Sequence, residues 1–239
     1  MALIGIGTGN PDHLTFQGAE AMRSADLILI PRKGADKADL ADLRRAIVTR
    51  VLGPDAPVAE FDLPVRDAGG DYLAGVEAWH DAIALAWETA AGRAQRVALL
   101  IWGDPSLYDS SLRIASRLSP APRIVVTPGI TALQALTAAH AIPLNTLGAP
   151  VLVTTGRRLA EGWPEGADTV AVMLDGTCAF RHLDPAGVTI WWGAFLGMQE
   201  QILLSGPLSD MAEQIAKTRA AARGRHGWIM DTYLLRRTR

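Results

Sequence analysis

The chain has 239 residues, of which 49% are hydrophobic and 20% are charged, and its formal net charge at pH 7 is -2. This hydrophobic content supports a substantial core, in one large domain or in two small ones. The small net charge argues against nucleic acid or an anionic membrane as a partner, and the single cysteine, Cys178, excludes an internal disulfide and a cysteine-based metal site.

The chain begins with a short apolar segment, Ala2–Ile6, which we interpret as a first strand. It lacks the basic region of a signal peptide and is too short to span a membrane. Together with the cysteine usage, this start fits a protein of the reducing cytoplasm. Further apolar runs are too short for helices and predict buried parallel strands at Asp26–Ile30, Val97–Trp102 and Ile124–Thr127.

Two helices are predicted between these strands. Thr15 can act as the N-cap of a helix that ends near Arg23. Apolar residues at helical spacing predict a second helix from Leu73 to about Gly92. The first half of the chain is therefore expected to be α/β.

The second half repeats the pattern with a new set of strands and is also expected to be α/β. Strands are predicted at Val151–Thr155, Thr169–Leu174, Val188–Trp192, Ile202–Leu204 and Trp228–Leu235. A helix should begin at Pro207–Ser209 and end near Arg219. Turn residues at Asn145–Ala149 place the domain boundary there, which gives domains of residues 1–146 and 147–239.

A Gly-rich loop, Gly5–Thr15, follows the first strand. Its alternating glycines let the backbone turn sharply and approach a ligand, and the next helix offers free N–H groups. The spacing is GxGxG, however, whereas the dinucleotide fingerprint is GxGxxG. A simple strand-to-helix turn and a phosphate cradle are equally good interpretations of this loop alone.

A central loop, Trp102–Ser110, follows the third strand of the first half. Asp104 stands at the carboxyl edge of that strand, where open α/β sheets place their ligands. Its carboxylate can accept hydrogen bonds from ribose hydroxyls or an amino group, or it can cap a helix. Tyr108 in the same loop can orient a substrate or simply contribute to packing.

A Pro-Gly loop, Pro128–Thr131, follows the fourth strand and leads into an Ala-rich helix. Thr131 is placed as its N-cap, and the small side chain of Ala132 leaves room for an aromatic ring near the backbone. Three strand ends in one half thus finish in glycine-containing turns, and together they can line one crevice.

Other polar residues have structural interpretations that compete with functional ones. His80 lies beside the apolar stripe of its helix, where a histidine is more often a buried structural residue than a catalyst. The basic residues of the first half can bind carboxylates of a ligand or form a solvent-exposed face. These are Arg32, Lys33, Arg44, Arg45 and Arg66.

Taken in order, these segments resemble the signature of the tetrapyrrole (corrin/porphyrin) methylases. The resemblance rests on the Gly-rich loop, on Gly103-Asp104-Pro105 with Tyr108, and on Pro128–Thr131. It continues through Gly193–Gln199 and Gly206–Leu208 in the second half, so it spans nearly the whole chain. Ala194 and Phe195 depart from it, because many relatives have threonines there.

The resemblance implies two α/β domains with S-adenosylmethionine in the cleft between them, usually in a homodimer. It places the donor at Gly103, Asp104, Pro105, Thr131, Ala132, Met173 and Ala194. The Gly-rich loop then lies nearer the tetrapyrrole substrate, for which Gly7, Gly9 and Pro11 are candidate contacts. Arg32, Lys33 and Arg66 are the candidates for its carboxylates.

Within the family, three segments resemble the members that convert precorrin-5 to precorrin-6A in cobalamin biosynthesis, by methylating C1 and releasing acetate. These segments are Ile30–Gly34, Leu63–Asp67 and Asp71–His80. Methyl transfer mainly requires in-line positioning and no metal, whereas loss of the acetyl group needs water and a general base. Asp67, His80 and Tyr108 are the catalytic candidates.

Three other functions stay open from the sequence. The chain can act on another precorrin of the same pathway. It can also be a nucleotide-dependent oxidoreductase that uses Gly5–Gly9, although the basic residues after its second strand suit only NADP. A non-catalytic tetrapyrrole carrier is the third, for which the sequence offers no iron-ligand pattern.

Overall fold

The computed structural model of the chain describes residues 1–32, 38–66, 69 and 72–237, without the side chains of residues 38, 39 and 72. The chain divides into two compact units, Met1–Thr131 and Ala132–Arg239. Helix α5 (Ala132–Ala139) falls in the second unit because it packs on two strands of that unit, β8 (Val188–Ala194) and β10 (Asp231–Arg237). The division therefore precedes this helix, whereas the turn residues of the sequence place a boundary after it.

The first unit contains one parallel sheet of five strands in the order β3-β2-β4-β1-β5. The strands are β1 (Ala2–Gly5), β2 (Leu27–Arg32), β3 (Val58–Asp62), β4 (Val97–Ile101) and β5 (Val125–Thr127). The helices are α1 (Phe16–Arg23), α2 (Ala38–Leu52), α3 (Tyr72–Ala91) and α4 (Ser111–Ala115), with a 3₁₀ turn, η1, at Pro11–His13. The predicted α/β class is confirmed, and Thr15 caps α1 by accepting the Gly18 N–H at 2.9 Å.

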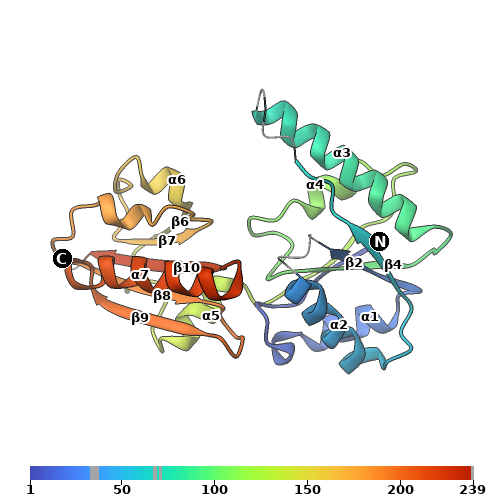
Figure 1. Cartoon of the computed structure of the whole chain (residues 1–239), viewed down its shortest axis with the longest axis horizontal. Helices are drawn as coiled ribbons and strands as arrows, with labels where there is room; N and C mark the ends of the chain where they lie inside the picture. Colours follow the sequence, from blue (N-terminus) through green and yellow to red (C-terminus); the bar gives the residue numbers. More distant parts are fainter. Residues whose placement is uncertain (33–37, 67–68, 70–71, 238–239) are drawn as a thin grey trace. The chain divides into compact units, whose positions relative to one another are not determined.

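Alternate residues of the strands face two separate cores. Leu3, Leu29 and Leu99 pack with residues of α3 and α4 on one face of the sheet. Ile4, Ile28 and Leu100 pack with residues of α1 and α2 on the other face (Figure 1). The adjacent strands β1 and β4 therefore send their connections to opposite faces, so the sheet has a topological switch point between them.

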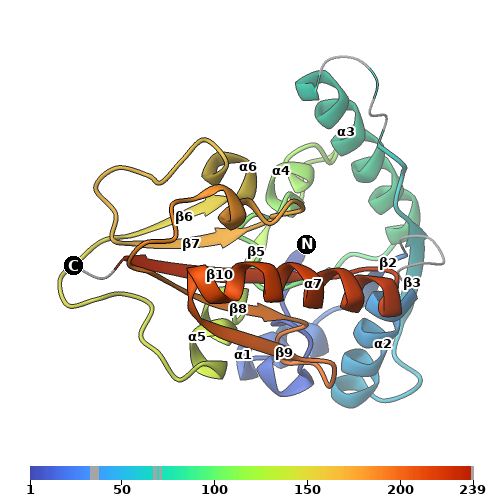
Figure 2. The same ribbon diagram turned by 60° about the vertical axis from the view of Figure 1, so that its left-hand side comes forward.

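The second unit contains a mixed sheet of five strands in the order β6-β7-β10-β8-β9. Besides β8 and β10, its strands are β6 (Val151–Thr155), β7 (Thr169–Met173) and β9 (Ile202–Pro207); only β6 and β7 pair in parallel. Helix α7 (Leu208–His226) crosses this sheet, and two short elements, α6 (Gly156–Leu159) and η3 (Ala179–His182), complete the unit (Figure 2). No helix in the described ranges is long and apolar enough to cross a bilayer.

Two predicted bounds in the second unit differ from the structure. Helix α7 continues past Arg219 to His226, where Gly227 at φ 72° ends it in the left-handed region. The last strand begins at Asp231, because Trp228 is buried against the ring of Phe195 with their centroids 5.0 Å apart. The end of the helix thus follows from a neighbouring glycine, whereas the start of the strand depends on a contact between residues distant in the sequence.

A buried polar network joins α7 to the ends of β7, β8 and β10. Asp231 accepts hydrogen bonds from Trp192 Nε1 at 2.9 Å and from Arg219 Nε at 3.0 Å. Arg219 also donates to the Asp175 carbonyl, and the Tyr233 hydroxyl donates to the Asp175 carboxylate at 2.6 Å. Burial raises the pKa of Asp231 above its ordinary value although Arg219 and Trp192 favour the carboxylate.

We predict that Arg219→Met lowers the free energy of unfolding by about 3–5 kcal/mol, because it leaves the Asp231 carboxylate buried without its cation. Denaturant unfolding at neutral pH measures the change. Arg223→Met, an exposed position on the same helix, is the control and should change stability by under about 0.5 kcal/mol. Equal effects of the two variants would show that the ion pair does not stabilise the second unit.

Candidate functional site

The candidate site lies at the carboxyl edge of the first sheet, beside the switch point between β1 and β4. Open parallel sheets bind ligands at this place because two neighbouring loops leave in opposite directions and open a crevice. Three of the loops predicted from the sequence start at this edge. They are the Gly-rich loop after β1, the central loop after β4 and the Pro-Gly loop after β5.

Backbone packs directly on backbone where these three loops meet. A Cβ atom at Gly129 would lie 2.1 Å from the Gly103 carbonyl oxygen and 2.8 Å from Gly5 Cα. A Cβ at Gly5 would lie 2.5 Å from the Gly129 nitrogen. Gly7 and Gly103 also exchange backbone hydrogen bonds of 3.3 and 2.8 Å. Only glycine fits at Gly5 and Gly129, and the contact fixes the three loops relative to one another.

Asp104 connects two of the loops through its carboxylate. One oxygen accepts the Ser106 N–H at 2.8 Å and the Ser106 hydroxyl, and the other accepts the Gly129 N–H at 2.9 Å. Burial disfavours the ionised form, but these hydrogen bonds outweigh it and hold the pKa of Asp104 below its ordinary value. Asp104 is 9% exposed, and both of its carboxylate oxygens accept hydrogen bonds from backbone N–H groups of the protein.

A small space lies beside the Gly103 backbone, although the residue itself is buried. A Cβ at Gly103, which has φ 67°, would meet no described atom closer than Thr131 Cα at 4.0 Å. Thr131 is half-buried and is the last residue of the first unit, whereas Pro105 is buried beneath the central loop. The space beside the Gly103 backbone is thus large enough for a methyl group and is bordered by the Thr131 backbone.

The Gly-rich loop folds back on itself. Gly7, at φ 77°, has no room for a side chain, because a Cβ would lie 2.4 Å from His13 Cβ. Gly9 is buried with φ 123°, and Pro11 is half-buried at the start of η1. The backbone conformation at these three predicted substrate contacts thus already explains why they are glycine, glycine and proline, without any contact with a substrate.

Of the three catalytic candidates, the structure describes two. Tyr108 in the central loop is 42% exposed and has φ 51°, a left-handed conformation that is costly for an aromatic residue and is common at functional sites. His80 is 2% exposed, and neither of its ring nitrogens has a partner among the described residues. Burial, Arg117 and Arg113 lower the pKa of His80. Asp67 lies outside the described residues.

Of the three predicted carboxylate-binding residues, Arg32 is already paired. Its guanidinium donates to both carboxylate oxygens of Asp62 at 3.1 and 3.0 Å. Arg66 is exposed, and Lys33 lies outside the described residues. A basic residue that the sequence leaves as part of a solvated face, Arg44, instead enters the region between β2 and β4, which no local pattern indicates.

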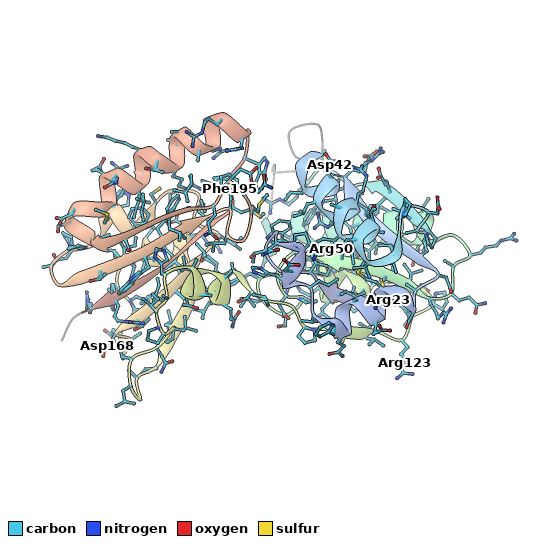
Figure 3. The ribbon with its side chains drawn as sticks, turned by 90° about the horizontal axis from the view of Figure 1, so that it is seen from below. Arg23, Asp42, Arg50, Arg123, Asp168 and Phe195 are labelled. Carbon is cyan, nitrogen blue, oxygen red and sulfur yellow. The ribbon has the colours of Figure 1, made fainter. Side chains whose placement is uncertain are left out.

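The remaining donor candidates belong to the second unit. Ala132 is the first residue of α5, Met173 ends β7 and Ala194 ends β8. Leu174 and Phe195 directly follow these two strands and have φ values of 54° and 51°. Figure 3 shows Phe195, whose ring packs on Trp228 and His226. Ala194 is fully buried, so neither its methyl group nor its backbone is exposed in this structure.

Residues 1–212 match the family model of the Tetrapyrrole (Corrin/Porphyrin) Methylases. The Sinorhizobium sp. precorrin-6A synthase [deacetylating] is 46% identical over an alignment 245 residues long, which covers 98% of this chain and 94% of that protein. The precorrin-2 C(20)-methyltransferase of the same source is 32% identical over 59% of each chain.

Solved structures agree with these sequence matches. A cobalamin synthesis related protein (CobF) from Corynebacterium diphtheriae superimposes with a TM-score of 0.86 at 38% identity, covering 99% of this chain and 97% of that one. The uroporphyrin-III C-methyltransferase of Thermus thermophilus, complexed with S-adenosyl homocysteine, gives a TM-score of 0.58 at 17% identity, covering 98% of this chain and 90% of that one. This last likeness concerns the fold alone.

We predict that Asp104→Asn lowers the free energy of unfolding at pH 7 by about 1–3 kcal/mol, because the new amide cannot accept from both Gly129 and Ser106. Since the folded pKa of Asp104 is depressed, the ionised carboxylate stabilises the protein above the unfolded-state pKa. That contribution is lost as the pH falls through the lower folded pKa.

Denaturant unfolding across the acid range measures this difference. The gap between the wild type and Asp104→Asn should narrow on acidification, and Asp184→Asn, at an exposed turn, should show no such gap. A gap that is absent at pH 7 or that widens in acid would contradict the assigned role.

Proposed function

The chain belongs to the tetrapyrrole (corrin/porphyrin) methylase family, and we propose that its substrate is precorrin-5, which it methylates at C1 while releasing the acetyl group as acetate. It is an S-adenosylmethionine-dependent methyltransferase of cobalamin biosynthesis. Support for the finer assignment comes from the relative named precorrin-6A synthase [deacetylating], which is 46% identical over almost the whole chain.

The observation that carries the donor assignment is the fixed contact of three loops at the carboxyl edge of the first sheet, with room for a methyl group beside the Gly103 backbone. S-adenosylmethionine, when bound, supplies a methyl group that is already activated by its sulfonium. The protein therefore has to hold reactants in line, and positioning can contribute roughly 7–11 kcal/mol to such a step. We assign this holding to the backbone of Gly103–Pro105 and Thr131, which Asp104 fixes from behind. Ala132, Met173 and Ala194 of the second unit are proposed as further donor contacts.

The acetyl group leaves in a second event, for which water has to be activated. A general base must come within hydrogen-bonding distance of that water. In the described structure the nitrogens of His80 are enclosed, so we assign His80 to the packing of α3 against α4. Tyr108, half-exposed in the central loop, is the described candidate that can reach a substrate, and Asp67 keeps its assignment from the sequence.

Two finer properties are proposed from the family resemblance and the cysteine usage. The enzyme is inferred to be a homodimer and to work in the cytoplasm. Its one thiol, Cys178, is buried and unpaired, which is compatible with a reducing compartment.

We expect the purified enzyme, incubated with S-adenosylmethionine and precorrin-5, to form S-adenosylhomocysteine, a singly methylated tetrapyrrole and acetate in equal amounts. Mass spectrometry of the tetrapyrrole and an enzymatic acetate assay measure the three products. The physical reason is that loss of the acetyl group follows C1 methylation in the same site, so neither product should accumulate alone.

The possible results separate the alternatives. Methyl transfer without acetate would keep the family and overturn the precorrin-5 assignment. Turnover of precorrin-2 in place of precorrin-5 would instead indicate the activity for which the second relative, the precorrin-2 C(20)-methyltransferase, is named. The same incubation without S-adenosylmethionine is the control and should release no acetate.

A further inference from the structure

Most arginines near β2 and α2 in the first unit are paired with carboxylates. Arg45 bonds Glu60 and Asp42, and Arg50 bonds Asp12 at 2.5 Å, as Arg32 bonds Asp62. Asp42 and Arg50 both belong to α2 (Figure 3). A cation already held by a carboxylate has less to gain from an anionic ligand, since the new ligand must compete for the same N–H groups.

Arg44, on the same helix, is different. Its Nε donates to the Leu100 carbonyl at 3.1 Å and its Nη1 to the Leu40 carbonyl at 3.1 Å, both neutral acceptors. Nη2 takes part in neither bond. Among the described residues no carboxylate forms an ion pair with Arg44, and Asp109 of the central loop is the acidic group that acts on it through its charge.

The course of the strands explains why an arginine reaches this place. Strand β2 pairs with β4 only from Leu27 to Leu29, and beyond that point it pairs with β3 alone. The Ile101 carbonyl turns toward β1, where it accepts the Ile6 N–H, so the Leu100 carbonyl turns toward β2. With no β2 residue opposite, this carbonyl is free to accept Arg44 Nε.

The charge of Arg44 is therefore held at the carboxyl edge of the sheet. Leu100 lies three residues before Gly103, where the predicted donor segment begins. Burial lowers the pKa of Arg44 to about 10, against the opposing effect of Asp109, so the guanidinium stays protonated at neutral pH. A half-buried cation that is poorly hydrated gains more from an anion than one in water.

We propose that Arg44 binds a carboxylate side chain of the tetrapyrrole and thereby sets the orientation of the macrocycle against the donor loops. This inference rests on the proposed function, because a precorrin is the polycarboxylated ligand that the site is assigned. It transfers to Arg44 the role that the sequence suggests for Arg32, whose guanidinium is occupied by Asp62.

The competing explanation is that Arg44 only fills the gap between β2 and β4. A filling role would affect the stability of the unit and the binding of both substrates together. A binding role would act on the tetrapyrrole alone, and a lysine, which keeps the charge, would restore part of it. The comparison of donor and acceptor affinities separates the two roles.

The experiment measures KM for precorrin-5, Kd for S-adenosylhomocysteine and the melting temperature of four proteins: the wild type, Arg44→Met, Arg44→Lys and Arg32→Met. For Arg44→Met we expect KM for precorrin-5 to rise by about tenfold or more, as for a lost charge-assisted hydrogen bond. Kd for S-adenosylhomocysteine should stay within about twofold, and Arg44→Lys should recover part of the loss. Arg32→Met tests the residue that the sequence suggested for this role, and it should change KM by less than about threefold because Asp62 already holds the Arg32 guanidinium.

Unchanged KM in Arg44→Met, or an equal loss of donor affinity, would overturn the proposal, as would a larger effect of Arg32→Met. Binding of a stable polycarboxylated porphyrin, followed by fluorescence quenching, gives a readout that needs no turnover. If the wild type fails to methylate precorrin-5, the proposed function fails. The porphyrin titration of Arg44→Met and Arg44→Lys then still decides whether Arg44 binds a tetrapyrrole carboxylate.

Discussion

The contact of three backbone loops at Gly5, Gly103 and Gly129 is the constraint on which the rest of the candidate site depends. A single Cβ at Gly129 would lie 2.1 Å from a carbonyl oxygen, so the loops can meet only if side chains are absent. Asp104 adds the bond that closes the contact, because its second oxygen reaches across to the Gly129 N–H. These contacts hold the three loops in one arrangement without a ligand, and such preorganisation lowers the entropic cost of ligand binding.

This contact needs the particular order of the first sheet. Strands β1 and β4 are neighbours whose chains leave for opposite faces, and β5 joins β1 on its other side, so all three loops start together. Strand β2 pairs with β4 only as far as Leu29, which leaves the Leu100 carbonyl to Arg44. The proposed donor loops and the proposed carboxylate-binding group therefore lie at one sheet edge, a suitable arrangement for an enzyme that must align two substrates.

Local sequence signals predicted a large part of this framework. Short apolar runs located β1, β2, β4 and β5, and the Thr15 cap located α1, because these features depend on neighbouring residues. Strand β3 alternates charged and apolar residues at the sheet edge and lacks the continuous apolar run that marks the buried strands. The bond from the Gly129 N–H to Asp104 and the pairing of Arg32 with Asp62 join residues far apart in the chain, so spacing could not predict them. The burial of His80, in contrast, agrees with the structural role that its place beside an apolar stripe favours.

The crystal structure of this protein with S-adenosylhomocysteine would test the central claim most directly. The account predicts ligand density against the backbone of Gly103–Pro105 and Thr131, with the Asp104 carboxylate still bonded to the Gly129 N–H and making no direct contact with the ligand. Density held instead by Gly5–Gly9, or an Asp104 side chain released from Gly129 to bind the ligand, would contradict it.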